Sequence, residues 1–254
     1  MDKRIGAQFY TIRATCKELA DFEESCRKVS EMGYKTIQLS GIGDFSAEDI
    51  KRIIDKYNLE VVCTHKESED FLEHLDELIK FHKTIGCHIC GVGYMPGSNA
   101  KLETIRTFIK NFVPVAEKLK ENGLTFAYHN HAYEFEKIDG RYGFDILMEE
   151  FKSDNFKLIL DVHWLAVAGL DVPKFIRKQK GKIACVHLKD LKMVGNSSTY
   201  AEIGQGNLEW ENIIPACEEA GAEYALVEQD ETDKDPFESL KISYDYLKEN
   251  GYTE

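Results

Sequence analysis

The sequence predicts an α/β fold, a (β/α)8 or TIM barrel that forms a single domain over residues 1–254. Apolar runs typical of buried strands alternate with amphipathic stretches typical of helices, at a mean period of about 30 residues. A length of 254 residues suits one such barrel. No stretch rich in glycine, serine and proline divides the chain, so we expect no second domain.

The first half of the chain contains four strand-and-helix units. We expect strands at residues 5–10, 36–39, 59–64 and 88–92, and helices at 17–32, after Ser46, at 68–85 and at 100–121. Ser46 is of a residue type that is favoured at a helix N-cap, and Asp49 follows three residues later, close to the capping-box pattern. The helix at 100–121 meets a stop signal at Asn122-Gly123.

The second half contains four more units, and each of its strands ends in a residue that can bind a metal or transfer a proton. The strands are expected at 124–130, 156–161, 182–187 and 223–228, with helices at 143–151 and from about Val172, Glu209 and Pro236. His129, Asp161, His187 and Glu228 lie at or next to the last residue of these strands, in that order. Residues of these types either bind a divalent ion or form an acid/base site.

The barrel prediction places these side chains at one mouth, because the active sites of this fold lie at the carboxyl ends of the strands. Residues i and i+2 of a strand point to the same side. The polar residues at strand ends are Gln8, Gln38, His65, His129, His131, Asp161, His163, His187, Lys189 and Glu228. The remaining histidines, His74, His82 and His88, fall on a helix or at a strand start and are interpreted as structural.

The composition indicates which classes of binding partner and which cellular compartment are expected. The net charge of −13 disfavours general nucleic-acid binding, because it repels phosphate backbones. No run reaches the ~18 apolar residues of a membrane span. Seven scattered cysteines indicate buried thiols in a reducing compartment, so we expect a cytoplasmic protein. The sequence leaves open whether the barrel forms a homo-oligomer.

Six motifs give the chain a resemblance to a known family. They are GAQFYTIR at the first strand, YHNHAYEF at the fifth, LDVHWLAVAG at the sixth, VHLKD at the seventh, IGQGNLEW in the following loop and ALVEQD at the eighth. Together they resemble the xylose isomerase-like TIM barrel superfamily, in particular its sugar phosphate isomerase/epimerase branch. They cover nearly the whole chain in the same order.

The resemblance implies one divalent metal ion, held by His129, Asp161, His187 and Glu228. Much of the superfamily has Glu where this chain has His129, so His131 and Glu134 remain alternatives for the first ligand. Two nitrogen and two oxygen ligands suit Mn, Zn, Fe or Co, whereas Mg prefers oxygen.

The resemblance also implies a metal-dependent sugar isomerase or epimerase that transfers a proton next to a carbonyl through an enediolate. Glu228 and either Glu134 or a histidine of the HNH segment, His131, would act as acid and base. Lys189 would bind an anionic oxygen. Residues expected to contact the substrate are Gln8, Tyr10, His65, His163, Trp164 and Gln205.

Two alternatives to this function remain open. The same enediolate could expel a hydroxyl, which would make the protein a dehydratase (lyase) of keto-inositols or 3-keto-sugars. Departures from the family pattern at His129 and Gln205 also allow a metal-free sugar-binding barrel. In each case the expected partner is a small sugar or polyol. The loops after the last two strands contain no glycine-rich phosphate cradle, which argues against a phosphorylated substrate.

Overall fold

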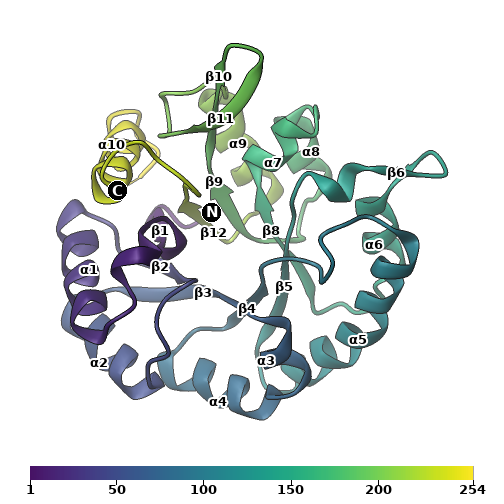
Figure 1. Ribbon diagram of the computed structural model, residues 1–254, viewed down its shortest axis with the longest axis horizontal. Coiled ribbons are helices and arrows are strands. Elements are labelled where there is room, and N and C mark those ends of the chain that lie inside the picture. Colours follow the sequence, from purple (N-terminus) through teal and green to yellow (C-terminus); the bar gives the residue numbers. More distant parts are fainter. Residues whose placement is uncertain (254) are drawn as a thin grey trace.

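Eight short, largely buried strands form a closed parallel barrel, seen along its axis in the computed structural model, which describes residues 1–253 (Figure 1). The barrel strands are β1 Gly6–Gln8, β2 Thr36–Leu39, β3 Glu60–Lys66, β4 Ile89–Val92, β5 Thr125–His129, β8 Phe156–Asp161, β9 Ile183–Leu188 and β12 Tyr224–Val227. Strand β1 pairs in parallel with both β2 and β12, which closes the sheet. The predicted (β/α)8 barrel is therefore confirmed.

Helices surround the barrel on its outer side (Figure 1). The α-helices are α1 Leu19–Met32, α2 Ala47–Lys56, α3 Ser68–Leu72, α4 Leu75–Ile85, α5 Leu102–Glu121, α6 Gly143–Glu150, α7 Val162–Val167, α8 Val172–Lys178, α9 Trp210–Ala220 and α10 Pro236–Glu249. The predicted N-cap is present, since Ser46 Oγ accepts a hydrogen bond from the Asp49 N–H at 3.1 Å. No helix within residues 1–253 is long and apolar enough to cross a membrane.

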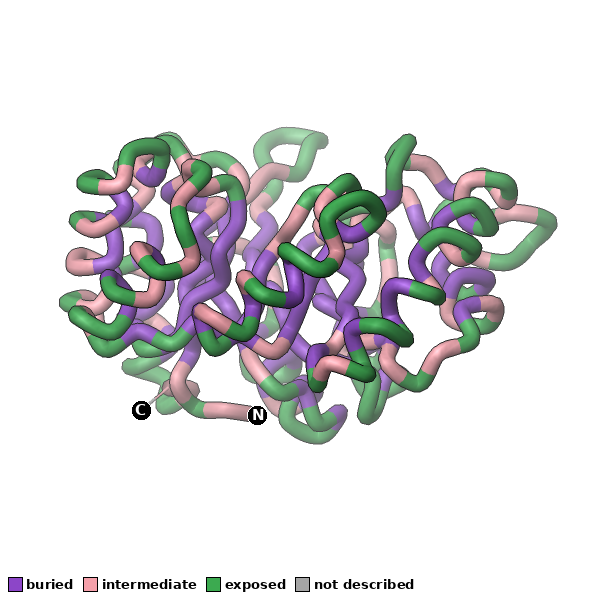
Figure 2. The backbone as a smooth tube through the Cα atoms, turned by 90° about the horizontal axis from the view of Figure 1, so that it is seen from below, coloured by how far each residue is buried: buried purple, intermediate pink, exposed green. Residues whose placement is uncertain are grey.

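The core has layers inside and outside the barrel wall. Two clusters of buried side chains pack helices against the outer face of the strands. A third cluster consists of strand residues alone, as expected where side chains fill the inside of a barrel. Figure 2 shows the buried backbone gathered at the centre, with exposed segments around it. All seven cysteines are free and buried, and Cys63 and Cys185 belong to the strand cluster.

Two predicted elements differ from the apolar pattern: one strand ends early and one helix is divided in two. The first strand stops at Gln8, whose side-chain oxygen accepts the Tyr10 N–H at 3.2 Å and caps the 3-10 helix η1 Phe9–Thr15. Tyr10 therefore lies on η1 and not on the strand. The helix expected at 68–85 is two helices, α3 and α4, because His74 has non-helical backbone angles (φ −127°, ψ 33°).

Four further features were not predicted, and all lie in segments that follow barrel strands. Strands β6 Lys137–Ile138 and β7 Arg141–Tyr142 form a hairpin, as do β10 Asp190–Val194 and β11 Ser197–Ala201. The β10–β11 hairpin projects from the barrel (Figure 1). Helix α7 follows β8 directly, and a 3-10 turn, η2 Tyr133–Phe135, follows β5.

Both ends of the described chain lie beside each other at the amino-terminal side of the strands. The hydroxyl of Thr253 donates to the carbonyl of Lys3 at 2.9 Å, and the Asp2 N–H donates to the carbonyl of Glu223 at 2.9 Å. Figure 2 marks both termini at the same edge of the molecule.

Candidate metal centre and active-site cavity

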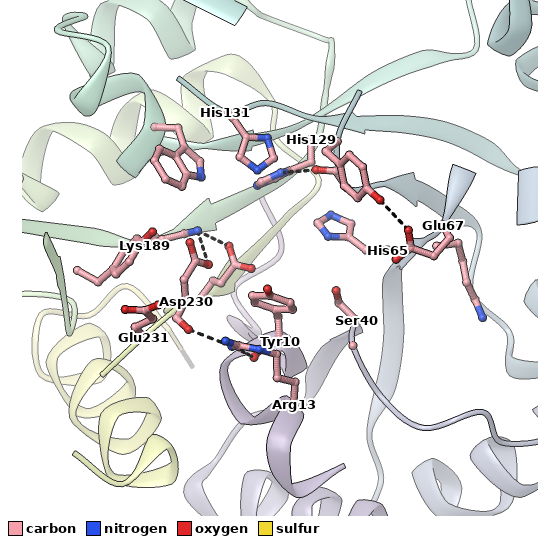
Figure 3. A pocket seen from close by; sticks show the side chains of 17 residues that line it. Tyr10, Arg13, Ser40, His65, Glu67, His129, His131, Lys189, Asp230 and Glu231 are labelled. Atoms are coloured by element: carbon pink, nitrogen blue, oxygen red, sulfur yellow. Dashed lines mark hydrogen bonds and ion pairs between the residues drawn. The ribbon is translucent and has the colours of Figure 1, made fainter. Parts of the chain in front are cut away.

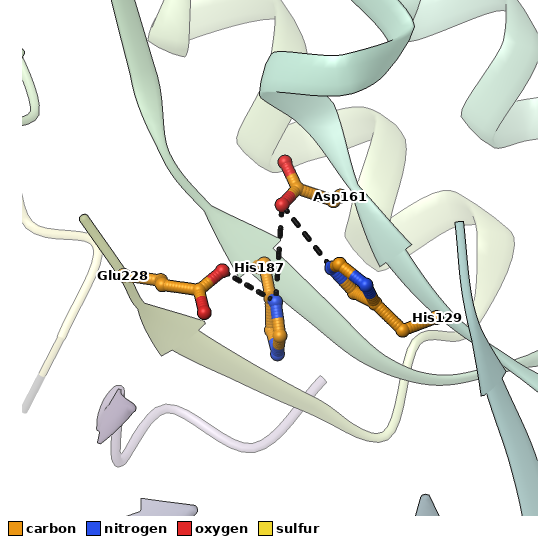
Figure 4. A group of neighbouring side chains, drawn as sticks. All are labelled: His129, Asp161, His187 and Glu228. Carbon is orange, nitrogen blue, oxygen red and sulfur yellow. Dashed lines mark hydrogen bonds and ion pairs between the residues drawn. The ribbon is translucent and has the colours of Figure 1, made fainter. Parts of the chain in front are cut away.

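Strand register brings four potential metal ligands together at the carboxyl ends of β5, β8, β9 and β12. Asp161 is directly opposite His187 in the β8–β9 pair. His187 is opposite Leu226 in β12, so Glu228 lies two residues further along the same edge. His129 is the last residue of β5. The four side chains point toward one another (Figure 4).

The distances within this group are short. His129 Nε2 lies 3.3 Å from Asp161 Oδ2, and His187 Nδ1 lies 2.8 Å from Glu228 Oε2 and 3.9 Å from Asp161 Oδ2. One ligand atom from each residue falls within 4.8 Å of every other, and all four residues are buried. Asp161, His187 and Glu228 therefore satisfy the expectation that they meet around a single point.

The group fits a divalent ion better than it fits a self-contained hydrogen-bond network. His187 Nδ1 is buried and makes no hydrogen bond of acceptable geometry to a described atom, although Glu228 Oε2 lies 2.8 Å away. Buried polar atoms are rarely left without a partner. Two imidazole nitrogens and two carboxylates are a suitable donor set for Mn, Zn, Fe or Co.

Neighbouring groups fix the orientation of the two imidazoles. His187 Nε2 lies 2.8 Å from the side-chain oxygen of Gln38, and His129 Nδ1 lies 3.0 Å from the carbonyl of Gly93. Both oxygens accept hydrogen bonds, so these ring nitrogens carry protons and the opposite nitrogens face the group. This arrangement is typical of metal-binding histidines. Asp161 is held in turn, because its Oδ1 accepts the His163 N–H at 2.9 Å.

Lys189 places an ammonium group against the same carboxylates. Its Nζ lies 2.9 Å from Asp161 Oδ2, 3.0 Å from Glu228 Oε2 and 2.9 Å from Asp230 Oδ1, and the residue is buried. Burial alone would lower the pKa of Lys189, but the three carboxylates raise it well above its usual value. Lys189 is therefore a permanent positive charge beside the candidate metal ligands.

A cavity of about 450 Å³ lies over this group at the mouth of the barrel. Figure 3 shows His129 and His131 on one side of the cavity and Tyr10 and Arg13 on the other, with Lys189 between them. The volume is within the ~300–1,000 Å³ that is usual for small-molecule sites. Of the residues predicted from the sequence, the cavity is lined by Tyr10, His65, His129, His131, Trp164, Lys189 and Glu228.

His131 presents an unengaged imidazole to the cavity. Its Nδ1 makes no hydrogen bond to the described part of the chain, and its ring stacks on Tyr133 at 5.4 Å between centroids. Burial, together with the neighbouring His129, lowers the pKa of His131 to about 3. The ring is therefore neutral at neutral pH.

Glu134 is buried and does not line the cavity. One carboxylate oxygen accepts the hydroxyl of Tyr128, and the other accepts the His131 N–H at 2.8 Å. Burial raises the pKa of Glu134 despite these hydrogen bonds. In this structure the carboxylate holds the turn that carries His131.

Three other residues expected to contact substrate also lie outside the cavity lining. Gln8 is fully buried and caps η1. His163 is buried against Tyr200, at 4.7 Å between ring centroids, and its Nδ1 donates to the carbonyl of Asp190 at 3.1 Å. Gln205 is exposed on the loop before α9, because the glycines on either side of it turn its backbone toward Asp190.

Asp190 is the main structural residue that the sequence interpretation missed. Its carboxylate is fully buried and accepts N–H groups of the IGQGNLEW loop and the Trp210 indole N–H, which lies at 2.8 Å. The backbone donors are Leu191, Gly204, Gly206 and Leu208. A Cβ atom on Gly206 would lie 2.3 Å from Asp190 Oδ1, so only glycine fits there.

Arg13, Asp230 and Glu231 were also missed, although all three line the cavity. Arg13 Nη1 donates to the carbonyls of Tyr10 at 2.8 Å and Asp230 at 3.0 Å, and its guanidinium lies 4.0 Å from the centre of the Tyr10 ring. It thus joins η1 to the loop after β12. The sequence could have indicated these three residues, because each lies shortly after the end of a predicted strand.

Comparison with known proteins gives a family and a set of similar folds. The family model described as "Xylose isomerase-like TIM barrel" matches residues 26–250. No curated protein matches the chain at a significant level. Among solved structures, a sugar phosphate isomerase/epimerase from Parabacteroides distasonis has a TM-score of 0.82 at 20% identity, covering 100% of this chain and 96% of its own.

Two other similar structures are named for different activities. An L-ribulose 3-epimerase has a TM-score of 0.77 at 17% identity, covering 98% of this chain and 94% of its own. A probable 3-DHS dehydratase from Bacillus anthracis has a TM-score of 0.75 at 13% identity, covering 98% of this chain and 99% of its own. At these identities the likeness establishes the fold, and activity must be argued from the site.

Proposed function

Since the chain belongs to the xylose isomerase-like TIM barrel family, we propose that it is a metal-dependent sugar isomerase or epimerase. The observation that carries this proposal is the buried His129, Asp161, His187 and Glu228 group at the floor of a sugar-sized cavity. Sugar isomerases and epimerases among the similar folds support the class. The substrate would be a small ketose, keto-sugar or polyol.

The four residues of the group would hold one divalent ion, Mn, Zn, Fe or Co. When bound, the ion would polarise the substrate carbonyl and stabilise the negative charge that develops on removal of the neighbouring proton. Asp161 and Glu228 are suited to bind a cation because nearby positive groups keep them ionised. Burial alone would raise the pKa of each, but Lys189 and the histidines of the group lower both.

His131 is proposed as one proton-transfer group. His131 lines the cavity and its ring is neutral, so the imidazole can accept a proton. Glu228, which borders the cavity as well as the metal group, is proposed as the other. Glu134 would act through His131, because its carboxylate fixes the His131 backbone.

Lys189 would stabilise an enediolate oxygen through its charge. Its ammonium lies on the cavity wall, 5.5 Å from the centre of the Trp164 ring and 5.7 Å from that of Tyr200. Trp164 and Tyr10 would offer ring faces to the apolar side of a sugar, and the His65 ring lies beside the metal group, 5.1 Å from the His129 ring between centroids. A cytoplasmic location agrees with seven free thiols.

Metal analysis of purified variants tests the proposal directly. Wild type reconstituted with Mn, Zn, Fe or Co is expected to bind about one ion per chain. His187→Ala and Glu228→Ala are expected to lose the ion and turnover of ketoses while retaining the circular dichroism of the folded barrel. His65→Asn is the control for metal content alone and is expected to retain the ion, because His65 lies in the same cavity but outside the group of four.

Either result below would contradict the assignment. Full metal occupancy in His187→Ala or Glu228→Ala would show that the ligands are others. A wild type that cannot be loaded with any of the four metals would favour a sugar-binding barrel. The mass of the product separates the enzyme classes, because a dehydratase removes one water and an isomerase or epimerase leaves the mass unchanged.

A further inference from the structure

The active-site cavity continues into a second cavity of about 360 Å³ above β2 and β3. The two share the lining residues Ser40, Gly41, His65, Lys66 and Glu67. Figure 3 shows Ser40 and Glu67 on the side of the main cavity away from Lys189 and Asp230. The second cavity, called the side cavity below, therefore extends the active site away from Lys189.

The side cavity combines apolar and acidic surfaces. Ile42, Phe45 and Phe81 supply the apolar part, and Asp44 and Asp70 add carboxylates beside the shared Glu67. Carboxylates accept hydrogen bonds from hydroxyl groups and repel anions. Aromatic and aliphatic side chains cover the C–H faces of a ligand ring. This combination fits an uncharged, hydroxyl-rich ring.

Lys66 lies where the two cavities join and lines both. Its Nζ lies 4.0 Å from the centre of the Phe81 ring. Within residues 1–253 the ammonium makes no hydrogen bond and has no carboxylate within 4.0 Å, unlike Lys189 with its three carboxylate partners. Three N–H donors are thus available at the junction.

We propose that the side cavity binds a second sugar ring, so that the substrate is a ketose or keto-sugar joined to another sugar. The reacting ring would occupy the main cavity, and Lys66 would donate to oxygens near the link between the rings. This inference rests on the proposed function for the reacting ring. The main cavity alone holds a monosaccharide, which leaves the side cavity for the additional ring.

Equilibrium binding measured by titration calorimetry on the metal-loaded protein tests the inference. The probes are D-fructose, D-fructose 6-phosphate and three glucosyl-fructoses linked through O3, O4 or O6 of fructose. At least one disaccharide is expected to bind about tenfold or more tightly than fructose, equivalent to ~1.4 kcal/mol. Fructose 6-phosphate is expected to bind no more tightly than fructose, because three carboxylates line the side cavity.

Two variants remove the side cavity's contribution by different means. Ile42→Trp fills it, and Lys66→Met removes the ammonium at the junction. Each is expected to reduce the preference for the disaccharide to below about threefold. Lys80→Met is the matched control, because exposed Lys80 precedes Phe81 on α4 and lies outside both cavities. It is expected to leave the preference intact.

The outcomes separate this inference from the proposed function. Binding of fructose without preference for any disaccharide overturns the inference alone. Tighter binding of fructose 6-phosphate that is lost in Lys66→Met also overturns it, since Lys66 would then serve an anion. Absence of binding by every probe overturns the inference and the proposed function together.

Discussion

The Lys189 ammonium and a bound metal ion would compete for the same two carboxylates. Its ammonium contacts Asp161 Oδ2 and Glu228 Oε2, and Glu228 Oε2 is also the atom 2.8 Å from His187 Nδ1. A divalent ion held by the group and this ammonium would share the same two carboxylates. Like charges at such separations repel strongly where water is excluded. Lys189 is therefore expected to limit the affinity of the site for metal.

Replacing Lys189 with Met tests this expectation. The substitution keeps the length of the side chain and removes its charge, so the affinity for Mn or Zn should rise by about tenfold or more. Competition against a chelator of known affinity measures the change. Lys182→Met, which removes a charge at the opposite end of β9, is expected to leave the affinity unchanged. Equal or weaker binding by Lys189→Met would show that Lys189 supports the ligands instead.

For single residues, the sequence predicted which side chains lie near the site better than it predicted the direction in which they point. Asp161, His187 and Glu228 could be predicted because each lies at or within one residue of a strand's carboxyl end, and parallel strands align these ends. The direction of Glu134 could not, because it depends on the Tyr128 hydroxyl and the His131 N–H that its carboxylate accepts. Gln205 was misplaced for a similar reason, since Asp190 determines the path of its loop.

Among the elements, the loop between β11 and α9 depends on a single carboxylate. Asp190 accepts five N–H groups from this loop, its own neighbour and Trp210. Because the carboxylate is fully buried, no water can replace it when it is lost. The loop and the start of α9 should therefore loosen as one unit.

Asp190→Asn is expected to lower the free energy of unfolding by about 2–4 kcal/mol, because an amide group turns N–H donors toward the N–H groups of the loop. Hydrogen exchange in residues 203–210 should accelerate at least about tenfold relative to the barrel strands. Asp171→Asn, which alters an exposed cap of α8, provides the control. Unchanged exchange in residues 203–210 would mean that other contacts hold the loop.

The elements themselves were predictable where periodicity and caps agreed. The strand expected at 156–161 coincides with β8, and helix α1 ends at Met32 as predicted, with Gly33 as its C-cap at a φ of 114°. The break between α3 and α4 had no such signal, because neither glycine nor proline occurs at Glu73 or His74. The hairpin turn at Asp139-Gly140 did have one, since both residues adopt the positive φ that Asp-Gly turns favour.

For the molecule as a whole, His82 couples stability to pH. It is fully buried, with Nε2 3.0 Å from Thr64 Oγ1 and Nδ1 3.1 Å from the carbonyl of Cys87. Burial lowers its pKa from 6.5 to about 3. Between these values the unfolded chain binds a proton that the folded chain does not, so stability falls as the pH falls.

The expected contribution of His82 is about 1.4 kcal/mol per pH unit between pH 6.5 and pH 3. Urea unfolding of wild type and His82→Gln, with a chelator present in both, measures it across this range. The variant should be less stable at pH 7 but should lose stability less steeply on acidification. Parallel slopes for the two proteins would show that His82 is protonated in the folded state.

Closure of the barrel was the most predictable feature, because eight alternating units of suitable length have few other ways to bury their strands. The placing of both chain ends side by side beneath the strands follows from that closure. A short bridge from residue 253 to residue 1 would keep every barrel strand in its present order. New ends could then be opened at the Asp139-Gly140 turn. We expect such a circularly permuted chain to form the same barrel.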